Sequence, residues 1–220
     1  HRMLAYAVDD KGSELFTIRV RDLATGTDLA DEIPDTRGEI QWANDSGSFL
    51  YIRVDDHHRP LFVYRHVIGT PVSQDALVYE EKDSGFYVAL DKTLSSRFLL
   101  IDAHDHQTNE VYLLDADRPE SGLVQVAART FGHEYQVQHH PDLLGDGVER
   151  LVVVTNSKGA EDFRICAAPV ATPGMAHWQE IVAHKPGRLI IDTALFRGHL
   201  VRLEREDSLP RIVVRAFADG

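Results

Sequence analysis

Residues 38–69 read GEIQWANDSGSFLYIRVDDHHRPLFVYRHVIG, and this stretch decides the fold class. It contains three runs rich in apolar, aromatic and β-branched residues, at 39–43, 48–54 and 61–68, and short polar turns separate them. Alternating side chains of this kind are typical of strands. A fourth run, at 76–79, follows a Gly-Thr-Pro break. Four short antiparallel strands in about 45 residues are typical of one propeller blade or one sandwich-like meander.

The second strand of this stretch has counterparts along the rest of the chain. They begin at Leu4, Phe98, Leu151 and Leu200, and a polar turn and another strand follow each of them. Neighbouring copies lie roughly 45 to 53 residues apart, as four-stranded repeats do. Any all-β chain shows strands at short intervals, but the recurring order of strand, polar turn and strand favours a repeat. The sequence therefore predicts an all-β fold, a β-propeller fragment of about four to five blades with up to four antiparallel strands each.

We expect a single propeller segment over residues 1–220 with an incomplete blade at each end. The chain opens at the second-strand position of a blade and lacks an initiator Met, so we expect an excised segment of a longer protein. The expected boundaries are a partial blade at 1–37, blades at 38–83, 84–130 and 131–187, and a partial blade at 188–220.

The composition argues against several classes of function. A formal net charge of −12 does not suit nucleic-acid binding, which needs clustered Lys and Arg. An acidic surface would attract cationic ligands such as basic peptides, but on charge alone we favour a cytoplasmic protein that its net charge keeps soluble. No apolar run is long enough to cross a bilayer and the start has no signal-peptide pattern, so we expect no membrane partner. Cys166 is the one cysteine, and we expect a buried, inert thiol in a protein of the reducing cytoplasm.

No catalytic or metal centre can be recognised in the sequence. The chain has no G-x-S-x-G elbow and no dinucleotide or P-loop glycine pattern, so we predict no catalytic residue and no cofactor. The closest histidine groupings are at 57–58, 104–106 and 139–140. Adjacent histidines on a strand point to opposite faces, and no zinc spacing is present, so we expect no metal. Asp9 and Asp55 end equivalent strands and are expected to accept bonds from local turn N–H groups.

Five stretches of the chain carry a likeness to a known family. They are EIQWANDSGSFLYIRV at 39–54, VYRHVIGTPVSQDALVYEEKDSGFYVALDKTLSSRFLLI at 63–101, EVYLLDAD at 110–117, HEY at 133–135 and TNSKGAEDFRI at 155–165. Within the second stretch, RHVIGTPVSQDALVYEEKD at 65–83 is quite specific to the family. Together they resemble the propeller domain of oligopeptidase B, a relative of prolyl oligopeptidase. The likeness runs through nearly the whole chain, is strongest over residues 42–117 and weakens after Pro169.

The resemblance implies a seven-bladed propeller that covers an α/β-hydrolase peptidase domain with a Ser-Asp-His triad. Members of the family cleave short peptides, and oligopeptidase B (protease II) cuts after Lys or Arg. The implied partners of this chain are therefore a C-terminal peptidase domain and short basic peptides. No triad residue can be carried over to this sequence, so the chain alone is predicted to be inactive as a serine protease.

A propeller can limit access to an active site because its innermost strands line a narrow channel that folded proteins cannot enter. Gln41, Gln136, Gln138 and Asp192 lie on the expected innermost strands and are candidates for lining this channel. The leading hypothesis is thus the substrate-gating portion of a cytoplasmic serine oligopeptidase. A stand-alone propeller that binds a protein partner is the alternative from another class, and a complete hydrolase with an unfamiliar site is the third.

Blades without neighbours would expose apolar side chains and edge strands. The residues expected to lose part of their cover in an excised segment are Leu4, Tyr6, Phe16 and Ile18 near the start and Leu200, Leu203, Ile212 and Val214 near the end. We therefore expect the isolated chain to self-associate.

Overall fold

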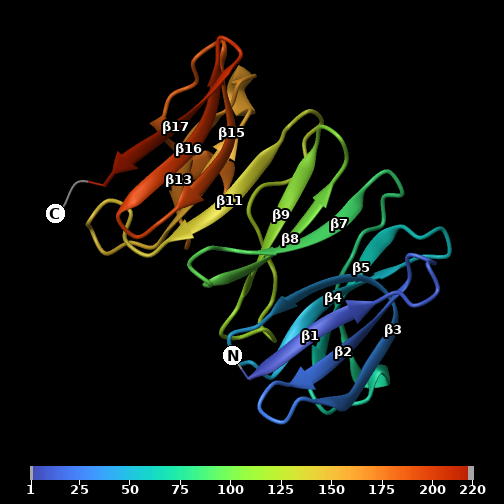
Figure 1. Ribbon diagram of the computed structural model, residues 1–220. Coiled ribbons are helices and arrows are strands. Elements are labelled where there is room, and N and C mark those ends of the chain that lie inside the picture. The colour runs from blue at the N-terminus through green and yellow to red at the C-terminus, as the bar shows by residue number, and fades with distance from the viewer. Residues whose placement is uncertain (1, 218–220) are drawn as a thin grey trace. The chain divides into compact units, whose positions relative to one another are not determined.

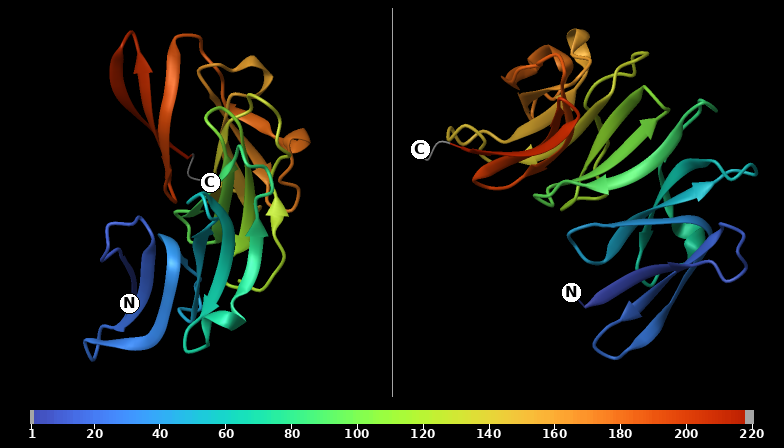
Figure 2. Two further views of the ribbon diagram at one scale, coloured as in Figure 1. Left: turned by 90° about the vertical axis from the view of Figure 1, so that its right-hand side faces the viewer. Right: turned by 45° about the horizontal axis from the view of Figure 1, so that its top comes forward.

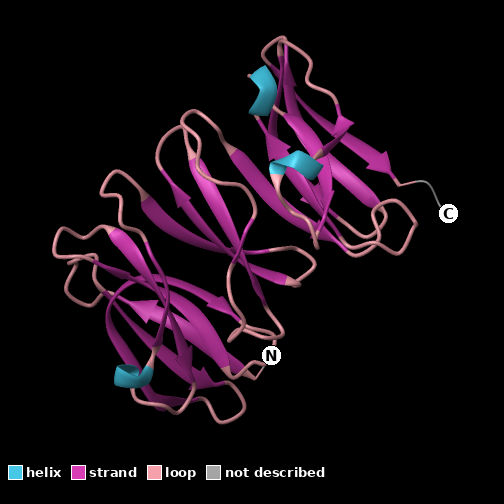
Figure 3. Cartoon of the chain, turned by 180° about the vertical axis from the view of Figure 1, so that it is seen from behind, coloured by secondary structure: helices cyan, strands magenta, loops and turns pink. Residues whose placement is uncertain are grey.

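The computed structural model describes residues 2–217, and strands dominate it (Figure 1, Figure 3). Strands make up 54% of the residues that the structure describes and helix 4%, which confirms the predicted all-β class. The helices in the described range are the short 3-10 turns η1 (Val72–Gln74), η2 (Ser157–Gly159) and η3 (Met175–His177). None of these has the length or the apolarity that a membrane-spanning helix requires.

The strands belong to two compact units. The first comprises the chain up to Lys92 together with Leu99–Asp105 and Leu114–Leu123, and the second comprises Thr93–Phe98, His106–Leu113 and the chain from Val124 onward.

The first sheet has six antiparallel strands in chain order. They are β1 (Met3–Val8), β2 (Phe16–Asp22), β3 (Thr27–Trp42), β4 (Ser48–Val54), β5 (Pro60–Val67) and β6 (Ala76–Glu80). The sheet exceeds the expected four strands because β3 is continuous. Its first half pairs with β2, as in Ile18 with Ile33, and its second half pairs with β4, as in Gln41 with Leu50. Strand β3 is therefore shared by two successive groups of strands, β1–β2 and β4–β6.

Gly38 allows β3 to change partners. Its φ is 91°, which favours glycine, and a Cβ at this position would come within 3.0 Å of the Phe16 ring. The core on this sheet contains the buried side chains of Ile18, Ile33 and Phe49. Trp42 packs edge-to-face on Phe49 with ring centroids 5.2 Å apart.

Three further antiparallel sheets follow, ordered β10-β9-β8-β7, β11-β12-β13-β14 and β15-β16-β17. Strands β7, β11 and β15 each lie at one edge of their sheet, and the orange-to-red strands β15–β17 run side by side in Figure 2. The bounds are β7 (Tyr87–Lys92), β8 (Phe98–His104), β9 (Asn109–Asp115), β10 (Val124–Gln125), β11 (Tyr135–His140), β12 (Arg150–Thr155), β13 (Arg164–Pro169), β14 (Gln179–Val182), β15 (Arg188–Leu195), β16 (His199–Glu206) and β17 (Leu209–Ala216).

The paired aspartates at strand ends organise turns, as predicted. The Asp9 carboxylate accepts hydrogen bonds from the backbone N–H groups of Lys11 and Glu14, the latter at 2.7 Å. The Asp55 carboxylate accepts from the backbone N–H of Arg59 at 2.9 Å and from its guanidinium at 2.6 Å. The guanidinium of Arg59 is the main reason why the pKa of Asp55 falls to about 2. These carboxylates are therefore structural.

Candidate functional site

The second half of β3 carries polar side chains along an open edge. After Gly38 this strand pairs with β4 alone. Ile40 and Trp42 pack into the core, so Glu39 and Gln41 lie on the opposite face of the strand. Glu39 is exposed and Gln41 is half-buried.

Side chains join the β3 edge to β7, within the first unit. Glu39 Oε2 accepts a hydrogen bond from the backbone N–H of Leu90 at 3.2 Å. In the opposite direction Lys92 Nζ donates to the Trp42 carbonyl at 2.8 Å. Burial lowers the pKa of Lys92. The side chain of Asp91, the preceding residue on β7, is exposed. A carboxylate that satisfies a backbone N–H of an edge strand also protects that edge from pairing with other chains.

In the second unit the candidates for lining the channel lie on two edge strands, β11 and β15. Gln138, on β11, is half-buried, and its Oε1 accepts a hydrogen bond from the backbone N–H of Leu94 at 2.9 Å. Gln136, two positions earlier on the same face of β11, is exposed. Asp192, on β15, is also exposed and accepts from the backbone N–H of Thr193 at 2.7 Å. The proposed channel-lining role of Gln41, Gln136, Gln138 and Asp192 stays a prediction.

Sequence reasoning overlooked the two carboxylates of the first unit, Glu39 and Asp91. Glu39 lies on β3 and Asp91 lies on β7. Glu39 precedes Gln41 by two positions, so it shares the face of that candidate. Asp91 precedes by two residues the Thr93 that closes its turn, as Gln41 precedes Ala43, and this correspondence with Gln41 would have been the signal for Asp91.

The adjacent histidines His139 and His140 make contacts in different directions, in agreement with their expected opposite faces. His139 Nδ1 lies 2.9 Å from Ser95 Oγ, and burial lowers the pKa of His139. His140 Nε2 donates to the Arg197 carbonyl at 2.9 Å, and its Nδ1 accepts from the Asp142 N–H at 3.0 Å. Within residues 2–217 no group of three or more His, Cys, Asp or Glu side chains is placed to hold a metal ion.

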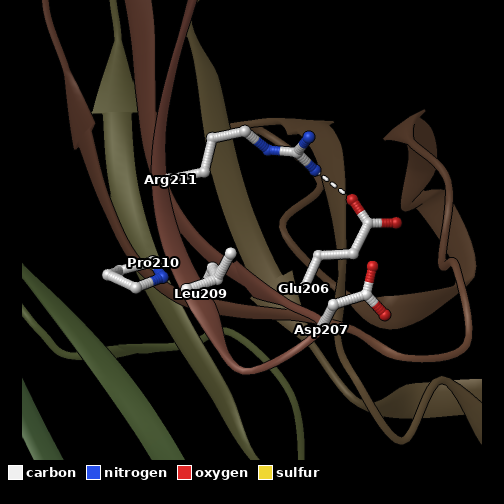
Figure 4. Close-up of a pocket in the computed structure, with 5 residues that line it drawn as sticks. All are labelled: Glu206, Asp207, Leu209, Pro210 and Arg211. Atoms are coloured by element: carbon white, nitrogen blue, oxygen red, sulfur yellow. Dashed lines mark hydrogen bonds and ion pairs between the residues drawn. The ribbon is translucent and has the colours of Figure 1, made fainter.

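A small pocket of about 370 Å³ lies at the turn between β16 and β17 (Figure 4). Arg211 forms an ion pair with Glu206 across it, and Lys185 also pairs with Glu206. The carboxylate is thus neutralised by its own neighbours. Because a single hairpin lines this pocket, it does not bring together groups from several elements as an active site does.

The chain matches, over residues 1–220, the family described as "Prolyl oligopeptidase, N-terminal beta-propeller domain". It therefore belongs to this family of propeller domains. It is 35% identical to dipeptidyl aminopeptidase BI of Pseudoxanthomonas mexicana, a match that covers 100% of this chain and 29% of the relative. It is 31% identical to protease 2 of Moraxella lacunata, over 97% of this chain and 30% of the relative.

Solved structures show the same fold. Oligopeptidase B from Leishmania major superposes with a TM-score of 0.90 at 30% identity, over 100% of this chain and 30% of that one. Oligopeptidase B from Trypanosoma brucei superposes with a TM-score of 0.86 at 28% identity, over 99% of this chain and 29% of that one. The chain is thus a propeller domain of the prolyl oligopeptidase and oligopeptidase B family, and it spans about 30% of the length of its curated relatives.

Proposed function

We propose that this chain is the access-limiting propeller portion of a peptidase that hydrolyses short peptides after Lys or Arg. The observation that carries the proposal is the family match over the whole chain. Relatives named as an aminopeptidase, a protease and oligopeptidase B agree with peptide hydrolysis. In this proposal an accompanying α/β-hydrolase domain supplies the Ser-Asp-His triad, and the propeller supplies the selection of substrates.

The selection has a steric and an electrostatic component. A narrow channel admits short flexible chains and excludes folded proteins. Carboxylates on innermost strands attract cationic peptides, and the net charge of −12 strengthens this attraction. We assign the electrostatic part to Glu39, Asp91 and Asp192, and a polar lining to Gln41 and Gln136, all of which are at least partly exposed.

Two further assignments belong to this proposal. Each of the ranges 38–83, 84–130 and 131–187 forms one blade, flanked by the partial blades 1–37 and 188–220. We also assign the protein to a reducing compartment, the cytoplasm, with which a single, buried and free Cys166 is compatible. Burial raises the pKa of the Cys166 thiol, which disfavours the reactive thiolate.

Neutralising Glu39 and Asp91 together should weaken the attraction for cationic substrates. In the full-length protein that carries this chain, we expect the double variant Glu39→Gln, Asp91→Asn to lower kcat/KM for short Arg-containing peptides about two- to tenfold at low salt. The loss should appear mainly in KM and should shrink at high ionic strength, because salt screens exposed charges. Steady-state kinetics at several salt concentrations measure it.

The matched control is Asp56→Asn with Glu161→Gln, which removes the same charge from two exposed turn positions. It should leave kcat/KM nearly unchanged. A full-length protein that cleaves no short peptide after Lys or Arg would contradict the proposed function itself. Cleavage with the same salt dependence in both double variants would contradict only the assignment to Glu39 and Asp91.

The isolated 220-residue chain should self-associate through β17. This edge strand exposes Leu209, Ile212 and Val214 at 70%, 71% and 60%, and exposed apolar side chains on an unpaired edge favour association. The expectation of lost cover is wrong for Ile18 and Leu200, which are 0% and 1% exposed. Ile18 is buried within the core of its own sheet, and Leu200 is buried in a cluster that includes residues of the β11–β14 sheet.

Sedimentation velocity should show dimers or larger species of the isolated chain at moderate salt. The double variant Ile212→Lys, Val214→Lys should shift them toward monomer, whereas Leu144→Lys, at an exposed loop position, should not. A strict monomer at high concentration would rule this association out.

A further inference from the structure

Three turns of the second unit enclose a pocket of about 780 Å³ that the proposed function does not use. They lie at residues 93–97, between β7 and β8, at 141–149, between β11 and β12, and at 196–198, between β15 and β16. The volume falls in the range of about 300–1,000 Å³ that is typical of small-molecule sites. Unlike the hairpin pocket of Figure 4, this one receives side chains from three separate segments.

Apolar side chains form one part of the wall of this pocket. Leu143 and Leu195 are 4% and 5% exposed and belong to the core of the second unit, so they form a fixed wall. Leu94 and Phe196 line the same pocket but are 58% and 55% exposed, so a ligand can cover them. Phe217 adds an aromatic wall and packs edge-on against His140 with ring centroids 5.1 Å apart. An apolar side chain bound here would gain burial energy.

Two opposite charges line the pocket, Asp142 and Arg197. Within residues 2–217 the Arg197 guanidinium has no hydrogen bond or ion pair, and the Asp142 carboxylate accepts from the Gly147 N–H at 2.9 Å without forming an ion pair. Neither charge therefore neutralises the other.

His140 holds the two turns that carry these charges. Its Nδ1 accepts from the Asp142 backbone and its Nε2 donates to the Arg197 backbone, at 3.0 and 2.9 Å. Since one ring nitrogen accepts while the other donates, the ring is neutral in this geometry. His140 is 4% exposed, so packing also fixes its orientation. The backbones of Asp142 and Arg197 are thus held at opposite edges of one imidazole.

We propose that this pocket binds a short zwitterionic peptide with apolar side chains. Arg197 pairs with the peptide carboxylate, Asp142 pairs with the peptide ammonium, and the apolar walls cover the side chains. Charge complementarity favours this ligand over the alternatives. Asp142 and Arg197 are both exposed, so a fatty acid could pair only with Arg197 and an uncharged apolar molecule with neither, whereas a zwitterionic peptide pairs with both. The site goes beyond the proposed function because it retains a peptide without cleaving it.

Isothermal titration calorimetry with the dipeptide Leu-Phe tests the proposal. The full-length protein is first inactivated with a serine-directed sulfonyl fluoride, and mass spectrometry checks that the dipeptide survives. We expect saturable binding, weakened about tenfold in Arg197→Gln and in Asp142→Asn, since each variant removes one charged hydrogen bond. N-acetyl-Leu-Phe-amide, which lacks both charges, should bind more weakly still. Arg205→Gln, an exposed arginine on β16, serves as the matched control and should bind as the unchanged protein does.

Thermal unfolding verifies that the variants are folded, and Arg197→Lys, which keeps the charge, should recover part of the affinity. Three results would overturn the proposal: no binding of Leu-Phe at 10 mM peptide, equal binding of the blocked peptide, or binding that neither charge variant weakens. Decanoate binding in place of Leu-Phe would also overturn it and would indicate a fatty-acid site. Because the readout is binding by inactivated protein, these outcomes are independent of whether the peptidase function is correct.

Discussion

His66→Leu is expected to lower the free energy of unfolding by about 3–5 kcal/mol, because it leaves two buried carboxylates without their shared partner. His66 is 0% exposed, with Nε2 2.9 Å from Asp31 Oδ1 and Nδ1 2.8 Å from Asp75 Oδ1. Tyr51 donates its hydroxyl to Asp75 Oδ2 at 2.8 Å, and burial together with this bond raises the pKa of Tyr51. The network connects β3, β4 and β5 to the loop before β6.

Urea unfolding of the 220-residue chain, followed by circular dichroism and tryptophan fluorescence, measures this loss. His57→Leu is the matched control because its side chain lies in the exposed turn after β4, and it should shift the free energy by less than about 0.5 kcal/mol. If the two variants unfold at the same urea concentration, the buried network does not stabilise the first unit.

Tyr135→Phe should destabilise the second unit by about 2–4 kcal/mol, although it removes a single oxygen atom. The buried hydroxyl accepts from the backbone N–H of Val111 at 2.8 Å and of Ala127 at 3.3 Å, and it donates to the Ala127 carbonyl at 2.9 Å. A phenylalanine ring fills the same space but leaves these backbone groups buried without that partner. The effect therefore measures hydrogen bonding with little change in packing.

Amide hydrogen exchange gives the most specific readout for this variant. The Val111 and Ala127 amides should exchange faster in Tyr135→Phe, together with a lower unfolding midpoint. Tyr87→Phe, at a 40% exposed position on β7, should change neither quantity appreciably. Unchanged protection of Val111 would show that its N–H finds another acceptor.

Local patterns in the sequence were sufficient for the class of fold. Alternation of side chains along residues 48–54 and 61–68 predicts strands, and the structure places β4 and β5 there. The roles of Asp9 and Asp55 were also predictable, because the N–H groups that donate to each carboxylate lie within five residues of it. The continuous strand β3 was not predictable, since its change of partner depends on the approach of Gly38 to Phe16.

Apart from the continuous β3, the sequence by itself determined the strands, the turns and the family likeness, because each depends on residues that are neighbours in the chain. Only the tertiary structure decided which polar groups meet. Asp31 and His66 are separated by 35 positions, and Val111 and Tyr135 by 24, so no local period relates them. The same holds for Asp142 and Arg197, which line one pocket although they come from different turns. Strand periodicity states which face a side chain occupies, whereas its partner depends on how sheets and turns pack together.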